Sequence, residues 1–148
     1  MSAFAELKPI REQLAAANND LSLLLVKSDF RDLVIRCVSA AVDKLTVLKG
    51  TGPGVASAAV AAACPANLAP HLSEMAVEML GHKNKFTTAV LSELTEKLFD
   101  KAAKLASKLD TPLPEWCSPS GLEQCLYACA MLNGMPTSAP EGEGVSVG

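Results

Sequence analysis

Aromatic side chains are scarce in this sequence, where four Phe, one Tyr and one Trp make up only 4% of the residues. A core with so few rings must be filled by Leu, Val, Ala and Met, which favours closely packed helices over a β-sandwich. The same scarcity argues against haem, because a proximal His71 or His82 would need a large apolar pocket around the porphyrin. The sequence therefore predicts no cofactor.

Charge is missing from one long segment, since no charged side chain occurs between Lys49 and Glu74. Within it, residues 54–63 consist entirely of Gly, Ala, Val and Ser. Side chains this small gain little from burial one at a time, so such a segment is stable where other backbones come close. The run is long enough to span a bilayer, but prolines interrupt it and Ala contributes little to insertion. We expect a helix contact surface and no membrane span.

Basic residues are absent from the end of the chain, because all thirteen Lys and Arg lie at or before Lys108. Residues 136–148 are rich in Gly, Pro, Ser and Glu and have no large hydrophobic residue except Val, which predicts a flexible acidic tail. Residues 1–135 have the length of a single helical domain. The net charge of −3 provides no general attraction for nucleic acid.

The N-terminus lacks the basic and apolar regions of a secretory signal. The five cysteines are odd in number and follow no regular framework, which indicates free thiols in a reducing compartment. We therefore expect a cytoplasmic or otherwise intracellular protein without a signal peptide.

Helical periodicity is what the sequence has in abundance, with apolar residues three and four positions apart and no strand-like alternation. Asn18 and Asn19 interrupt the first periodic segment, while Asn67 and Asn84 are candidate N-caps of later ones. This pattern predicts an all-α fold, a compact antiparallel bundle of five or six helices with a flexible acidic C-terminal tail. The expected segments are residues 9–24, 28–48, 55–64, 70–80, 84–109 and 118–133.

The small-residue helix at residues 55–64 is the first candidate site, either as the central strut of the bundle or as an exposed docking face. Its predicted contact residues are Val55, Ala58, Ala59 and Ala62. The leading functional hypothesis is a non-enzymatic interaction or assembly protein, structural or scaffold in kind. It would self-associate or bind a protein partner through this helix.

A basic track on the long helix is the second candidate. Four lysines recur there at spacings of four, three and four residues, which aligns them on one side, and two more precede them. A nucleic-acid backbone is the natural partner of such a track, so the alternative function is a coat or packaging protein. Acidic residues share the helix, however, so a solvated face is the competing interpretation. The lysines are Lys83, Lys85, Lys97, Lys101, Lys104 and Lys108.

Two cysteines are the third candidate, because Cys125 and Cys129 stand four apart on one predicted helix. No His or second Cys pair lies near them in sequence, so we predict no metal site. The simplest interpretation is that both are small, buried hydrophobic residues. The alternative is a redox or small-molecule-binding bundle.

We recognise no catalytic motif in the sequence. Glu74 and Glu78 form a carboxylate pair at a spacing common on exposed helix faces. The turn at residues 51–54 lacks the Lys and the preceding strand of a phosphate-binding loop. We therefore predict that the protein is not an enzyme.

Overall fold

The computed structural model describes residues 3–110 and 113–132, which form helices and turns and contain no strand. The predicted all-α fold is confirmed. The tail expected at residues 136–148 lies outside the described residues. The 3-10 helices are η1 (Ala3–Leu7) and η2 (Pro65–Asn67), and the α-helices are α1 (Lys8–Ala16), α2 (Leu21–Leu24), α3 (Ser28–Leu45), α4 (Pro53–Ala63), α5 (Glu74–Met79), α6 (Thr88–Ala106) and α7 (Pro119–Leu132).

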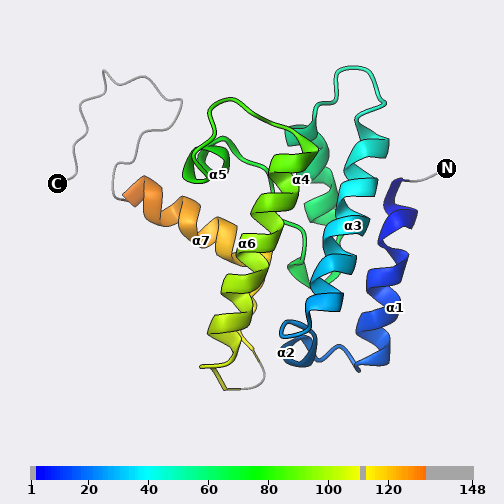
Figure 1. Cartoon of the computed structure of the whole chain (residues 1–148), viewed down its shortest axis with the longest axis vertical. Helices are drawn as coiled ribbons and strands as arrows, with labels where there is room; N and C mark the ends of the chain where they lie inside the picture. The colour runs from blue at the N-terminus through cyan, green and yellow to red at the C-terminus, as the bar shows by residue number, and fades with distance from the viewer. Residues whose placement is uncertain (1–2, 111–112, 133–148) are drawn as a thin grey trace.

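Helix α3 is the centre of the bundle, because it contacts α1, α4 and α6 and runs antiparallel to each of them (Figure 1). Its apolar residues recur every three or four positions, so they share one broad face that the neighbouring helices cover. The buried residues of α3 are Phe30, Val34, Cys37, Val38, Ala41 and Val42.

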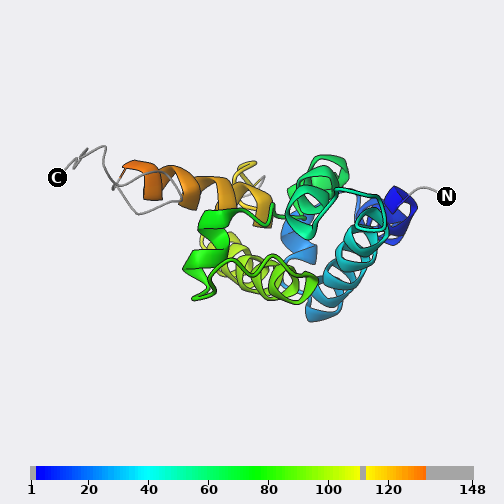
Figure 2. The same cartoon turned by 90° about the horizontal axis from the view of Figure 1, so that it is seen from above.

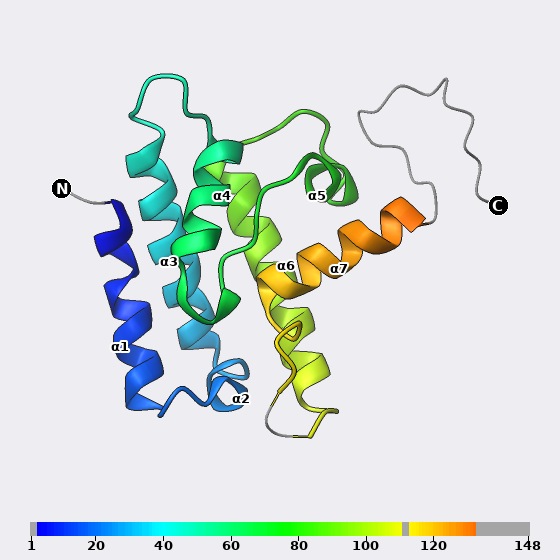
Figure 3. The ribbon, with the colours of Figure 1, turned by 180° about the vertical axis from the view of Figure 1, so that it is seen from behind.

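Helix α6 joins this bundle to a second group made of α5 and α7. Figure 2, seen from above, shows α7 running away from the bundle on the side opposite the N-terminus. The view from behind in Figure 3 shows the same departure, with the start of α7 against α6 and its end at the edge of the molecule. Much of α7 therefore has neighbours on one side only.

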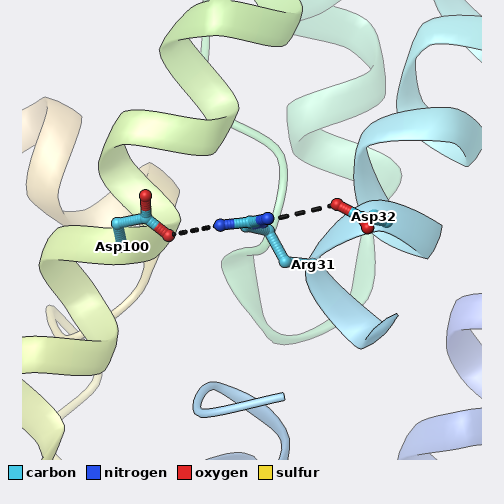
Figure 4. Close-up of polar contacts among 3 residues, drawn as sticks. All are labelled: Arg31, Asp32 and Asp100. Carbon is cyan, nitrogen blue, oxygen red and sulfur yellow. Dashed lines mark hydrogen bonds and ion pairs between the residues drawn. The ribbon is translucent and has the colours of Figure 1, made fainter. Parts of the chain in front are cut away.

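The contact between α3 and α6 combines an aromatic pair with a surface ion pair. The rings of Phe30 and Phe99 lie 5.9 Å apart at a tilt of 56°, and both residues are buried. Outside them, Arg31 Nη1 donates to Asp100 Oδ1 at 2.9 Å and Arg31 Nε contacts Asp32 Oδ1 at 3.4 Å (Figure 4). The hydrogen bond to Asp100 is the main cause that raises the pKa of Arg31.

The break predicted at the first asparagines is confirmed. Asn18 and Asn19 have φ values of 53° and 59°, a left-handed conformation that Asn tolerates and that ends α1. Asp20 then caps α2 by accepting a hydrogen bond from the Ser22 amide at 3.1 Å. With this break, the six expected segments become seven α-helices among the described residues.

The N-caps expected at Asn67 and Asn84 are wrong. Both residues have positive φ, 55° and 56°, whereas an N-cap needs an extended backbone. Ser73 caps α5 and Thr87 caps α6, each accepting from a backbone amide three residues on. Asparagine is common both at N-caps and in left-handed turns. The two asparagines therefore predicted the positions of the loops correctly, but not the residues at which the helices begin.

Candidate functional site

The small-residue helix α4 has one buried and one exposed face. Ala56, Ser57 and Val60 are buried in the bundle. The predicted contact residues lie on the opposite, exposed face, where Val55 is 65% exposed. The helix is therefore no central strut, and its outer surface is open to a partner. Together with Val55, the exposed residues are Ala58, Ala59 and Ala62.

Helix α7 carries the apolar stripe expected from the sequence, but most of that stripe is not buried. Of its residues only Leu122 is buried, while Leu126 is 38% and Leu132 is 75% exposed. The expectation that Cys125 and Cys129 are buried is wrong, since both are exposed. The physical reason is that no described helix packs over this side of α7. We call Leu122, Cys125, Leu126, Cys129 and Leu132 the α7 stripe.

The α7 stripe, apart from Leu132, forms one wall of a cavity of about 340 Å³, which we call the α5–α7 groove. Helix α5 provides the second wall and α6 the third. The lining is apolar apart from Lys97, Lys101 and Glu123. The groove is lined by Met75, Ala76, Met79, Leu80, Leu94, Lys97, Leu98, Lys101, Leu122, Glu123, Cys125, Leu126 and Cys129.

Local geometry fixes the start of α7 on α6. Ser118 accepts a hydrogen bond from the Gly121 amide at 3.0 Å, in the cap position that the sequence predicted before Pro119. A Cβ at Gly121 would lie 2.5 Å from the Trp116 carbonyl oxygen, so the preceding turn can approach only because this residue is glycine. Cys117 is buried beneath that turn, with its Sγ 3.6 Å from the carbonyl oxygen of Ala102. The direction of α7 is thus set at its first turn.

A buried carboxylate connects α7 to α5. Glu123 is 5% exposed, and Ser73 Oγ donates to its Oε2 at 3.1 Å. The same hydroxyl accepts from the Ala76 amide at 3.1 Å and so caps α5. Burial raises the pKa of Glu123, against the opposing effects of the Ser73 hydrogen bond and the nearby His71. Sequence reasoning missed this residue, although it is the only charged one in α7.

We expect Glu123→Gln to change how stability depends on pH. Because the folded pKa is raised above the ordinary value of 4.5, the folded chain binds this proton more tightly than the unfolded chain. Wild-type stability should therefore fall as the pH rises from 4.5 through the folded pKa, and then level off. Glutamine has no proton to lose and still accepts from Ser73, so the variant should lack this fall. Urea unfolding of both chains at a series of pH values measures this difference in the free energy of unfolding.

The exposed Glu96 offers a matched control for this prediction. Glu96→Gln should keep the wild-type pH profile, because this side chain lies in water on α6. A Glu123→Gln variant that retains the full acid-side dependence would show that the buried carboxylate is not its source.

All six lysines of the basic track are exposed, but they do not form one uniform surface. Lys97 Nζ lies 3.7 Å from Glu93 Oε2, and Glu93 also contacts His82 Nε2 at 3.0 Å. The hydrogen bond with His82 is the main cause that lowers the pKa of Glu93. Lys97 and Lys101 line the α5–α7 groove, while Lys104 and Lys108 lie beyond it. Binding of a polyanion to the track stays a prediction.

Among residues 3–110 and 113–132, no three or more His, Cys, Asp or Glu side chains are placed to hold a metal ion together. Nor does this part of the chain contain a helix with the length and apolar character needed to cross a membrane. The sequence matches no protein-family model, and comparison with curated proteins and with solved structures gives no significant match.

Proposed function

We propose that the chain is a non-enzymatic helical assembly protein that pairs with a second copy of itself through the α7 stripe and the α5–α7 groove. One observation carries the proposal: an uncharged helix surface faces an open apolar groove. Residues 124–132 of α7, which are all exposed except Ala130, contain no charged side chain. Apolar surface of this kind marks protein contacts when it is contiguous.

The energetics favour a partner over solvent at this surface. Covering a leucine or methionine side chain completely contributes about 1.5–3 kcal/mol. Met79 in the opposite wall is 46% exposed, and methionine side chains adapt to irregular gaps, which suits a groove that receives another helix. The residues of the α7 stripe are three and four positions apart, which is the spacing of the anchor residues when an amphipathic helix binds in a groove.

A protein partner explains the exposed surface better than a small molecule does. The apolar surface continues along α7 to Met131 and Leu132, which are 53% and 75% exposed and do not line the groove. A small molecule held in the groove would leave both in water. A helix laid along α7 would cover them together with the groove.

The outer face of α4 is the competing surface for self-association. Ala58, Ala59 and Ala62 each offer a single methyl group, and burial contributes only about 0.8 kcal/mol per CH2-sized group. The α7 stripe offers leucines of several times that apolar size. We therefore place the main contact on α7 and leave α4 as the alternative for the experiment to decide.

Hydrogen exchange at low and high protein concentration tests the proposal. Pairing through α7 should slow amide exchange in residues 122–132 and 75–80 as the concentration rises, because these helices open less often when covered. Residues 53–63 of α4 provide the internal control, and their amides should exchange at the same rate at low and high protein concentration. Slowing confined to α4, or none anywhere, would overturn the proposal.

A further inference from the structure

We propose that a second cavity, formed by α7 and the residues at the start of α5, binds a small organic molecule through a primary ammonium group. This cavity, which we call the Glu123 pocket, has a volume of about 330 Å³. It is lined by His71, Ser73, Glu123, Gln124 and Tyr127. None of these residues belongs to the α7 stripe, so the inference goes beyond the proposed pairing.

The Glu123 pocket and the α7 stripe lie on different sides of α7. At 3.6 residues per turn, Gln124 and Tyr127 are rotated away from the face that carries Leu122 and Cys129. Glu123 lies between the two sides and lines both the pocket and the α5–α7 groove. A molecule bound in the pocket therefore leaves the stripe free to pair.

Glu123 is a buried carboxylate without a cationic partner. It is 5% exposed, and no described residue forms an ion pair with it. Lys97 and Lys101 line the groove on its other side, but the ion pair of Lys97 is with Glu93. An ionised carboxylate is costly to bury unless an opposite charge and hydrogen bonds compensate it. A cationic ligand would supply the missing charge.

One oxygen of this carboxylate is available to a ligand. Oε2 accepts from Ser73 Oγ at 3.1 Å, whereas Oε1 receives no hydrogen bond from the part of the chain that the structure describes. Every fully buried polar side-chain atom in that part has a partner, so Oε1 is accessible. An accessible acceptor on a residue that is otherwise buried suits an N–H donor from a bound molecule.

The neighbouring side chains also suit an ammonium group. Tyr127 lies one turn after Glu123, so its ring is on the same side of α7, and the face of an aromatic ring attracts a cation. Gln124 Nε2 donates to Ser120 Oγ at 3.3 Å, which leaves the amide oxygen of Gln124 free to accept. A primary ammonium group has the positive charge and the three N–H donors that this set of side chains can bind.

An anion or a metal ion fits the pocket less well. Within the described part of the chain its lining includes no lysine or arginine, and its only basic side chain is the exposed His71. The carboxylate would repel an anion. A metal ion needs several ligands close together, and the described residues contain no such group of His, Cys, Asp and Glu. The volume is at the lower end of ordinary ligand sites, which indicates a small molecule.

Titration of the wild-type chain with phenethylamine, followed by amide NMR, tests the inference. The signals of residues 71–73 and 123–127 should shift and saturate, with a Kd of about 1 mM or below. The matched probe is 2-phenylethanol, which has the same ring and chain length but no charge. It should bind at least about tenfold more weakly, because a hydrogen bond to a charged group contributes more than a neutral one.

Variants of two pocket residues show which groups bind the probe. Glu123→Gln removes the charge and keeps an acceptor for Ser73, so phenethylamine should bind at least about tenfold more weakly. Tyr127→Leu keeps an apolar side chain without the aromatic face and should weaken binding about threefold. Glu96→Gln removes a carboxylate from the exposed side of α6 and should leave the Kd unchanged.

Four results would overturn the inference. They are equal binding of 2-phenylethanol, unchanged binding by Glu123→Gln, shifts confined to the groove residues Leu94 and Leu98, and no saturable shift at all. The comparison of the two probes uses the wild-type chain, so it does not depend on how well a variant folds. Light scattering measures pairing separately, so failure of the ammonium site would leave the proposed function standing.

Discussion

Replacing Leu126 with glutamate should keep the chain monomeric at concentrations where the wild type pairs. Leu126 lies in the middle of the α7 stripe and lines the α5–α7 groove. A two-fold contact contains Leu126 twice, so the variant loses two leucine side chains and places two carboxylates in a largely apolar contact. The association constant should therefore fall at least about a hundredfold. Sedimentation velocity over a dilution series measures this change. Because Leu126 is 38% exposed in the single chain, the fold itself should be little affected.

Ala59→Glu is the matched control, since it adds the same charge to the outer face of α4. Ala59 is exposed, and we expect this variant to pair like the wild type. The reverse result, with Ala59→Glu monomeric and Leu126→Glu paired, would move the contact to the α4 face that the sequence first predicted.

Replacing Phe99 with alanine should lower the free energy of unfolding by about 3–5 kcal/mol. Phe99 is 1% exposed on α6, and its ring packs against that of Phe30 on α3. Alanine would leave a cavity where the two halves of the molecule join, and neighbouring helices relax into such a cavity only in part. This loss is a large share of the stability of an ordinary domain. Chemical denaturation measures it.

Leu48→Ala provides the control for this prediction, because Leu48 is 59% exposed and its removal opens no cavity. Its free energy of unfolding should stay within about 0.5 kcal/mol of the wild-type value. A Phe99→Ala chain as stable as Leu48→Ala would show that the α3–α6 contact does not depend on the aromatic pair.

For α7, the sequence predicted the apolar face of the helix but not whether that face is buried. The spacing of apolar residues, three and four positions apart, correctly predicted the face that contains Leu122, Cys125 and Cys129. Periodicity reports which face of a helix is apolar, but not what covers it. The expected burial of both cysteines failed because α7 leaves the bundle and no described helix covers that face.

The α5–α7 groove could not be predicted, because the periodicity of three successive helices does not tell at which angles they pack against one another. Only the packed structure brings Met79, Lys97 and Cys129 together. Glu123 is a different case, since a lone charge in an otherwise uncharged helix is a visible signal of a buried, hydrogen-bonded group. The hydroxyl that it meets belongs to Ser73, fifty residues earlier in the chain.

The molecular mass of the wild-type chain in solution tests self-association through α7 most directly. Light scattering over a dilution series should show a mass that rises with concentration from the 15.4 kDa of one chain toward that of two. Added salt should not reduce this mass, because apolar burial is not screened by ions as the lysine track would be. A mass of one chain at every concentration, or pairing that added salt abolishes, would contradict assembly through the α7 stripe.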